Sequence, residues 1–225
     1  MSSDKLYPEG LLGKKIGMTH VIDGDGKCVP VTVVEVGPCY ILGVRNQEQH
    51  GYSAVQLGFG SKKLERANKA EIGNFSKAGK GAFYHVNEIR CNTEKLGWKE
   101  LGQEIKVGEV FSDGEFVDIT GTSIGRGFAG VVKKFKMAGQ PATRGTHEYE
   151  RHIGSIGCRK TPGRVLRGRR MAGHLGNERV TVQNLKIYAV KPEENLILVQ
   201  GGIPGSKGGL VVVKKAVKKY GVTAA

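Results

Sequence analysis

The chain has 225 residues, 39% of them hydrophobic and 25% charged, which is enough for a buried core in one large or two small domains. Its 35 Lys and Arg against 21 Asp and Glu give a net charge of +14 and a pI near 9.7, which indicates a polyanionic partner such as nucleic acid. A membrane partner is disfavoured, because the basic stretch has no accompanying apolar helical face and no run approaches the roughly 18 apolar residues of a span. The N-terminal residues lack the pattern of a secretory signal, so none is expected.

The four cysteines, Cys28, Cys39, Cys91 and Cys158, include no Cys-x-x-Cys pair. Zinc ribbons need such pairs to close a tetrahedral site, so we expect no structural metal, and no motif calls for another cofactor. Cysteines at this spacing without a signal peptide are typical of reduced thiols, which predicts a cytoplasmic protein.

The first 120 residues have the pattern of a β-sheet protein. The turn signal Asp23-Gly-Asp-Gly26 and the break at Gly37-Pro38 separate runs rich in β-branched residues. Pro30 favours an edge or the start of its strand. The predicted strands cover residues 10–22, 28–36, 40–45, 53–59, 109–111 and 116–120. Short strands at this spacing predict a small barrel or sandwich.

Residues 61–98 differ in character and are predicted to form a mixed insertion. A short helix is expected at 62–71 and a strand at 83–90, and Trp98 is expected to pack rather than to stack on a base. After residue 178 the strand pattern returns at 179–190, 196–200 and 210–213. The predicted fold is therefore mainly β: a small closed barrel from 1–120 and 179–225, with a largely irregular extension at 121–178.

We call residues 121–178 the basic extension. Residues 121–180 hold 13 basic and 3 acidic side chains, whereas residues 1–120 hold 15 basic and 16 acidic ones. Apolar residues occur singly here, without the period of a helix or strand, and glycines recur every few residues. A structureless stretch of this length is usually functional or disordered, and solvated charged tails are normally terminal and rich in lysine. We interpret the extension as a polyanion-binding arm.

Three features of the extension would instead indicate an enzyme. Gly125-Arg-Gly-Phe-Ala-Gly130 matches a dinucleotide-binding fingerprint, but the helix expected at 131–137 is too short for a βαβ crossover. His147-Glu148 begins a zinc-protease motif, yet its second histidine, His152, comes one residue late. Cys158 lies among basic residues without a paired base. We expect no catalysis, although a nucleotide-dependent enzyme or a diffusible RNA chaperone remains an alternative.

Binding to RNA explains the residues of the basic extension better than an enzymatic role does. Arginine binds phosphate with two parallel hydrogen bonds, and glycines let backbone amides approach phosphates closely. The extension contains no recognisable pair of stacking aromatic residues, which favours recognition of folded RNA by its shape.

The chain resembles the bacterial form of the universal large-subunit ribosomal protein L3 family over nearly its whole length. The resemblance is carried by motifs that occur together and in order: Gly13-Lys-Lys-Ile-Gly-Met-Thr19, Gly125-Arg-Gly-Phe-Ala-Gly130, Gly154-Ser-Ile-Gly157, Arg159-Lys-Thr-Pro-Gly-Arg164, Met171-Ala-Gly173 and Asn177-Glu-Arg-Val-Thr-Val182.

The resemblance implies a barrel like that of translation factors, a role in early subunit assembly and neighbouring ribosomal proteins as partners. It also implies an extension that passes through large-subunit ribosomal RNA toward the peptidyl transferase centre. Neither a membrane nor a small-molecule substrate is implied. The segment expected nearest the catalytic RNA is Gly154, Ser155, Ile156, Gly157 and Cys158. The expected RNA contacts are Arg126, Lys133, Lys134, Lys136, Arg144, Arg151, His152, Arg159, Lys160, Arg164, Arg167, Arg169, Arg170, His174 and Arg179.

Three positions depart from the common family pattern. Arg144 stands where histidine is common, and Ile153 replaces a common proline before Gly154. Cys158 occupies the position of a glutamine that is methylated in some relatives, so that modification is impossible here.

Overall fold

The computed structural model describes residues 9–91 and 101–219, which form two compact units. The first unit combines the residues up to Thr122 with those from Arg179 onward, and the second unit is Ser123–Glu178. The expected packing role of Trp98 lies outside the described residues. Within those residues, no helix has both the length and the apolar character needed to cross a membrane.

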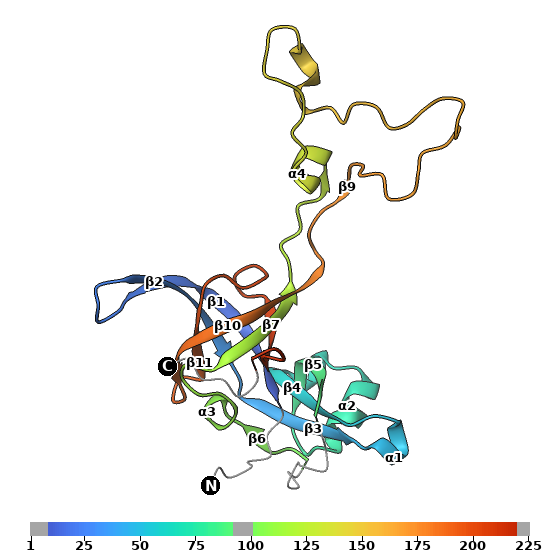
Figure 1. Cartoon of the computed structure of the whole chain (residues 1–225). Helices are drawn as coiled ribbons and strands as arrows, with labels where there is room; N and C mark the ends of the chain where they lie inside the picture. Colours follow the sequence, from blue (N-terminus) through green and yellow to red (C-terminus); the bar gives the residue numbers. More distant parts are fainter. Residues whose placement is uncertain (1–8, 92–100, 220–225) are drawn as a thin grey trace. The chain divides into compact units, whose positions relative to one another are not determined.

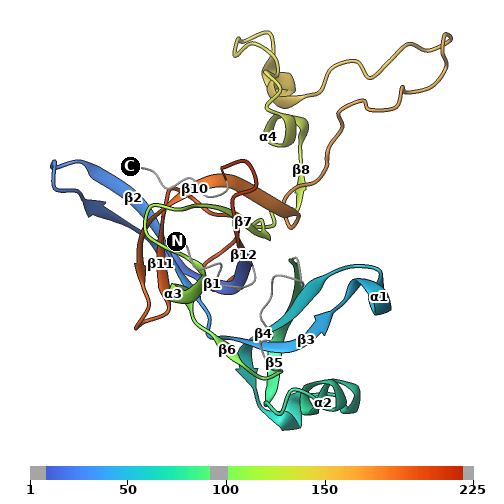
Figure 2. The ribbon, with the colours of Figure 1, turned by 60° about the horizontal axis from the view of Figure 1, so that its bottom comes forward.

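Six antiparallel strands of the first unit close into a barrel in the order β1-β12-β7-β10-β11-β2 (Figure 1, Figure 2). Their bounds are β1 Gly10–Ile22, β2 Cys28–Val36, β7 Phe116–Thr122, β10 Arg179–Lys191, β11 Leu196–Gln200 and β12 Leu210–Lys215. This confirms the prediction of a mainly β protein with a small closed barrel.

The barrel interior is filled by alternate residues of each strand, as the two-residue period of a β-strand requires. Val34 and Val36 in β2 are fully buried, and so are Val117 and Ile119 in β7 and Ile197 in β11. Burying one such aliphatic side chain contributes roughly 1.5–3 kcal/mol, so this inner layer is the main source of the barrel's stability.

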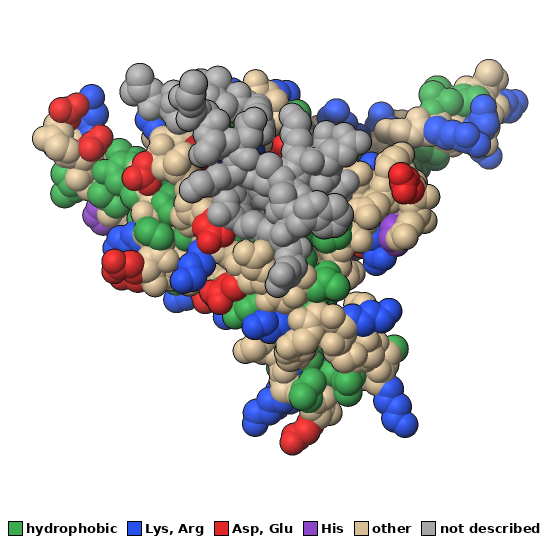
Figure 3. Space-filling view, turned by 90° about the horizontal axis from the view of Figure 1, so that it is seen from below, with side chains coloured by type: hydrophobic (Ala, Val, Ile, Leu, Met, Phe, Trp, Pro, Cys, Tyr) green, Lys and Arg blue, Asp and Glu red, His purple; other side chains and the backbone are tan. Residues whose placement is uncertain are grey.

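β1 and β2 continue beyond the barrel as a two-stranded hairpin. β12 pairs with β1 only as far as Lys14, whereas β1 and β2 remain paired as far as Ile22 and Cys28. The turn between them carries both acidic and basic side chains, seen at the left of Figure 3, with an ion pair of 3.5 Å between Lys27 Nζ and Asp25 Oδ2. Mixed charge at the turn contrasts with the excess of basic side chains in the basic extension.

The first unit also holds a four-stranded sheet in the order β5-β4-β3-β6. Its strands are β3 Cys39–Arg45, β4 Ala54–Lys62, β5 Ala82–Arg90 and β6 Glu104–Ile105. The unit's helices are α1 Gln47–His50, η1 Leu64–Arg66, α2 Lys69–Ser76 and α3 Val107–Val110. β3 and β4, which were expected in the barrel, pair instead with β5 and β6, so this second sheet begins well before residue 61.

A single hydrophobic core joins the barrel to this sheet. Leu11 and Val213 from the barrel belong to the same buried cluster as Ile41, Leu57 and Ile89 from the second sheet. A smaller cluster packs α2 onto the sheet, with the rings of Phe75 and Phe83 in edge contact at 5.7 Å. The sheet is therefore part of the body rather than a loosely attached insertion.

The strand expected at residues 109–111 is wrong. Residues Val107–Val110 form one helical turn, in which the amide of Phe111 donates to the carbonyl of Val107 at 3.0 Å. Val107 and Val110 are both buried, and positions three apart lie on the same face of a helix. Tertiary burial of that face thus overrides the strand preference of valine.

The second unit contains only short regular elements. They are β8 Phe128–Ala129, α4 Val131–Phe135, η3 His147–Arg151 and β9 Gly173–His174, with β8 and β9 pairing as a two-stranded ribbon. Most of the remaining residues of the unit follow an irregular path.

Candidate nucleic-acid interface

The second unit begins as a hydrogen-bonded ribbon formed by its two ends. The amide of Ser123 donates to the carbonyl of Glu178 at 2.9 Å, and that of Arg126 donates to the carbonyl of Leu175 at 2.8 Å. The amide of Leu175 in turn donates to the carbonyl of Gly127 at 2.9 Å. The backbone of this segment is therefore satisfied by its own two strands, which fixes the direction of the side chains along them.

Gly176 allows the two strands of the ribbon to approach each other closely. Its φ of +76° lies in the left-handed region, and a Cβ placed there would overlap the carbonyl oxygen of Ile124. The same Cβ would also lie 3.1 Å from the Cα of Gly125. Only glycine meets both conditions without strain, so the ribbon depends on this residue.

α4 places a group of cations around one aromatic ring. Lys134 Nζ lies 5.2 Å from the ring centroid of Phe135, and the guanidinium of Arg170 lies 5.7 Å from it. Lys136 ends the helix in the left-handed conformation, with φ of 55°. The ring of Phe135 thus brings Arg170 against α4, although Arg170 follows Phe135 by 35 positions in the chain.

Residues 139–154 fold into a compact loop around η3. The amide of Gln140 donates to the carbonyl of Glu150 at 2.9 Å, and the hydroxyl of Thr146 donates to the carbonyl of Pro141 at 2.5 Å. The rings of Tyr149 and His152 meet edge to face, with centroids 4.9 Å apart. A hollow of about 420 Å³ is lined by Gln140, Gly145, Thr146, Tyr149, His152, Ile153 and Gly154.

The segment expected nearest the catalytic RNA is held by hydrogen bonds from side chains to its backbone carbonyls. The hydroxyl of Ser155 donates to the carbonyl of Gly157 at 3.2 Å, and the guanidinium of Arg169 donates to the carbonyl of Ser155. Gly154 has a φ of +75°. All five residues of the segment are exposed, so the segment presents mainly backbone and small side chains to a partner.

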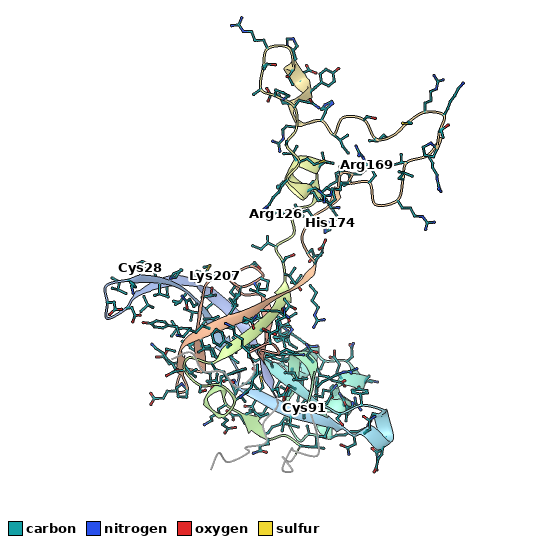
Figure 4. The ribbon with its side chains drawn as sticks, viewed as in Figure 1. Cys28, Cys91, Arg126, Arg169, His174 and Lys207 are labelled. Carbon is teal, nitrogen blue, oxygen red and sulfur yellow. The ribbon has the colours of Figure 1, made fainter. Side chains whose placement is uncertain are left out.

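Most of the expected RNA-binding side chains lie together in the second unit, with only Arg179 in β10 of the first. All fifteen are exposed except Lys134, which is half-buried. Among the residues that the structure describes, no ion pair joins any of them to a carboxylate. Arg126 and His174, labelled in Figure 4, come from the two strands of the ribbon, where the amide of Arg126 donates to the carbonyl of Leu175. The unit therefore offers a dense set of cations whose charge is not neutralised within the protein.

The geometry gives no support to the enzyme motifs. β8 has two residues, α4 has five, and their sheet has two strands, so the glycine fingerprint at 125–130 is not part of a βαβ unit. His147 begins η3 with a φ of 47°, and no group of three potential metal ligands is found in the described parts of the chain.

Two exposed aromatic residues were missed by the sequence reasoning. Phe128 is 80% exposed and Tyr149 is 62% exposed, and both belong to the second unit. Each stands alone in a stretch rich in glycine and charge, which is the only signal that the sequence offers. An isolated aromatic residue is normally assigned to a core, and only the structure shows that no core covers these two.

The comparisons with known proteins agree in one family. A model of the family described as ribosomal protein L3 matches residues 84–195. The chain is similar to a protein of Syntrophotalea carbinolica, named large ribosomal subunit protein uL3, with 46% identity over 93% of this chain and 99% of the relative. Proteins with the same printed name from Corynebacterium jeikeium and Acidothermus cellulolyticus are each 50% identical over 93% of this chain, covering 95% and 93% of those relatives.

Proposed function

Because the chain belongs to the ribosomal protein L3 family, we propose that it is a structural constituent of the large ribosomal subunit in the cytoplasm and binds large-subunit ribosomal RNA. The basic extension, residues 121–178, is the main RNA-binding element. The protein carries out no reaction itself and acts by holding RNA in place.

The observation that carries this proposal is the exposed, unneutralised charge of the second unit. Like charges this close repel one another unless counterions or a polyanion neutralise them. Phosphate groups of RNA would do so, and each neutralised phosphate releases a bound cation into solution, which favours binding. Arginine supplies most of the cations, and its planar fork suits bidentate contact with phosphate.

The irregular backbone of the unit suits the same partner. Regular helices and strands use their amides internally, whereas residues 153–172 form no helix or strand and, apart from the hydrogen-bonded amides of Gly157 and Arg169, leave amides available to phosphate oxygens. The glycines of this stretch let RNA approach the backbone without obstruction by a Cβ. Recognition would therefore follow the shape of folded RNA.

Two finer parts of the proposal rest on the family resemblance. The segment Gly154–Cys158 is directed toward the peptidyl transferase centre, and the protein joins the subunit early in its assembly. The barrel contacts neighbouring large-subunit proteins, for which the apolar side chains on the β1–β2 hairpin are suitable: Met18 is 57% exposed and Ile22 is 69% exposed.

Sedimentation of the tagged full-length protein from cell lysate tests the proposal. We expect the protein to remain with large subunits in near-stoichiometric amount through a high-salt wash, because buried contacts to many phosphates exchange slowly. A protein that moves to the top of the gradient in moderate salt would instead be the diffusible RNA chaperone, and the proposal would be wrong.

A matched pair of variants connects this result to the second unit. In one, Arg164, Arg167, Arg169 and Arg170 are changed to Gln. In the control, the exposed residues Lys27, Lys63, Lys69 and Lys77 of the first unit are changed to Gln, which removes the same charge. We expect only the first variant to be lost from subunits in the salt wash. Equal loss of both would show that net charge alone governs binding.

A further inference from the structure

The β8–β9 ribbon has two unlike faces. Phe128 pairs with His174 across the ribbon and Ala129 pairs with Gly173, and residues directly opposite each other point to the same side. Ala129 is 4% exposed, and a Cβ on Gly173 would lie 3.0 Å from Lys134 Nζ, so this face is covered from within the unit. The opposite face carries Phe128 at 80% exposure beside the exposed His174.

Phe128 exposes its ring on a hydrogen-bonded ribbon, and a partner that covered this ring would stabilise the contact. Leaving most of a phenyl ring in water forgoes the free energy of its burial, and no described side chain of the second unit covers it. The backbone that carries the ring is fixed, because the amide of Leu175 donates to the carbonyl of Gly127, next to Phe128, and Phe128 itself pairs with His174. The face is therefore a preformed platform of two flat rings.

The charge around the platform selects the kind of partner. Arg126 lies two residues before Phe128, and its amide donates to the carbonyl of Leu175, the chain neighbour of His174, so all three residues belong to the ribbon, on which Figure 4 labels Arg126 and His174. Two flat rings and a guanidinium on one short ribbon match a nucleotide, whose base stacks on aromatic rings while its phosphate is bound by arginine. An apolar side chain of a neighbouring protein would cover the phenyl ring but would leave the cation without a counterpart.

We propose that Phe128 and His174 form a stacking platform for one unpaired base of large-subunit RNA, and that Arg126 binds the adjoining phosphate. This inference rests on the proposed function and adds to it a contact with a base, in a unit whose other expected contacts are with phosphates. Stacking tolerates any base, so the platform recognises the presence of a flipped-out nucleotide rather than its identity.

Binding of the full-length protein to protein-free large-subunit RNA, measured over a range of salt concentrations, tests the inference. We expect Phe128→Ala to weaken binding roughly 5- to 100-fold, the range that corresponds to loss of one base stack. The slope of log Kd against log salt concentration should stay unchanged, because no phosphate contact is lost. Arg126→Gln should lower that slope by about one.

Three further variants separate stacking from other roles of the ring. Phe128→Trp keeps an aromatic face and should bind like the wild type, whereas Phe128→Leu keeps only apolar bulk and should bind like Phe128→Ala. Leu166→Ala, at a residue of the same unit that is 63% exposed, is the matched control and should change little.

The outcomes distinguish this inference from the function it rests on. If the wild-type protein fails to bind large-subunit RNA, the proposed function itself is wrong. If the wild type binds and Phe128→Ala or Phe128→Leu binds equally well, the platform is wrong while the function stands. A Phe128→Ala variant that binds RNA normally but is missing from assembled subunits would assign the ring to a protein partner, which also overturns the inference.

Discussion

Lys215 Nζ lies 3.0 Å from Glu115 Oε1, and the Glu115 side chain is only 9% exposed. Lys215 ends β12 and Glu115 directly precedes β7, so this ion pair links two neighbouring barrel strands. The second carboxylate oxygen of Glu115 accepts a hydrogen bond from the amide of Ser112 at 3.3 Å. The carboxylate is thus held in place on both sides at the edge of the barrel.

Removing the lysine should leave that nearly buried carboxylate without its counter-charge. We expect Lys215→Met to lower the free energy of unfolding by about 1–3 kcal/mol, less than for a fully buried pair because Lys215 is 28% exposed. Urea unfolding followed by circular dichroism measures the change. Lys27→Met removes a pair whose side chains are 77% and 78% exposed and should leave the midpoint unchanged; an equal shift in both would contradict the argument.

The hydrogen bond between Tyr52 and Glu88 should make the stability of the first unit depend on pH. The Tyr52 hydroxyl donates to Glu88 Oε2 at 2.7 Å, and this hydrogen bond is the main reason why the pKa of Glu88 is lowered from its ordinary value. A carboxyl whose folded pKa is lowered contributes stability above its unfolded pKa, and that contribution is lost as the pH falls through the folded pKa.

We therefore expect Tyr52→Phe to destabilise the first unit at neutral pH, and the difference from wild type to shrink at an acidic pH below the lowered pKa of Glu88, where that carboxyl is protonated. Denaturant unfolding at the two pH values measures this difference. Tyr84→Phe is the control, because its hydroxyl accepts a hydrogen bond from Arg66 and has no carboxylate partner in the described structure. A penalty for Tyr52→Phe that grows as the pH falls would refute the assignment.

Gly176→Ala should open the ribbon at the base of the second unit. The added Cβ overlaps the carbonyl of Ile124 in a backbone conformation that alone costs about 1–2 kcal/mol for a residue other than glycine. Amide hydrogen exchange of the full-length protein should quicken at Arg126 and Leu175. Gly130→Ala is the control, because nothing lies within 4 Å of its Cβ position and its φ is −68°. Unchanged exchange in Gly176→Ala would show that the ribbon accommodates a Cβ at this position and would contradict the argument.

The cysteines should differ sharply in reactivity. Burial raises the pKa of the Cys39 thiol to about 12, whereas Cys28 and Cys158 are exposed. The thiolate is the reactive form, so at about pH 8 roughly one Cys39 in ten thousand is reactive. We expect iodoacetamide to modify Cys28 and Cys158 of the free protein and to leave Cys39 intact, as measured by peptide mass spectrometry. Rapid modification of Cys39 in folded protein would contradict its buried position.

Single arginines of the second unit should contribute through phosphate contacts. We expect Arg164→Gln to lower the salt slope of binding to large-subunit RNA by about one, with a similar loss of affinity for any RNA sequence. Lys63→Gln, at an exposed lysine of the first unit, should leave the slope unchanged. A variant Arg164→Gln that loses affinity at an unchanged slope would place Arg164 in a contact other than with phosphate.

Much of the barrel could be predicted from the sequence, because its strands alternate in the pattern that a half-buried strand requires. Leu196–Gln200 was predicted at its observed bounds, and β10 differs from its prediction by one residue. What the sequence could not show was pairing. The strand pattern at Tyr40 is the same whether it joins the barrel or a second sheet, and only long-range contacts decide between the two.

The candidate site was predictable to the extent that it consists of charge. Lysine and arginine without nearby carboxylates are visible in the sequence, and the structure leaves them exposed. The platform was not predictable, because exposure is a property of the fold. Phe128 and His174 are 46 residues apart, and only the register of β8 and β9 makes them neighbours.

The closure of the barrel has a consequence for the order of events during synthesis. β1 pairs with β12 through Gly10 and Lys214. β7 pairs with β10, which follows the second unit in the sequence. A chain leaving the ribosome therefore exposes the whole basic extension before three of the six barrel strands have been made. Because partners so distant in sequence pair slowly, the basic extension of the newborn chain is complete and exposed before its body can fold.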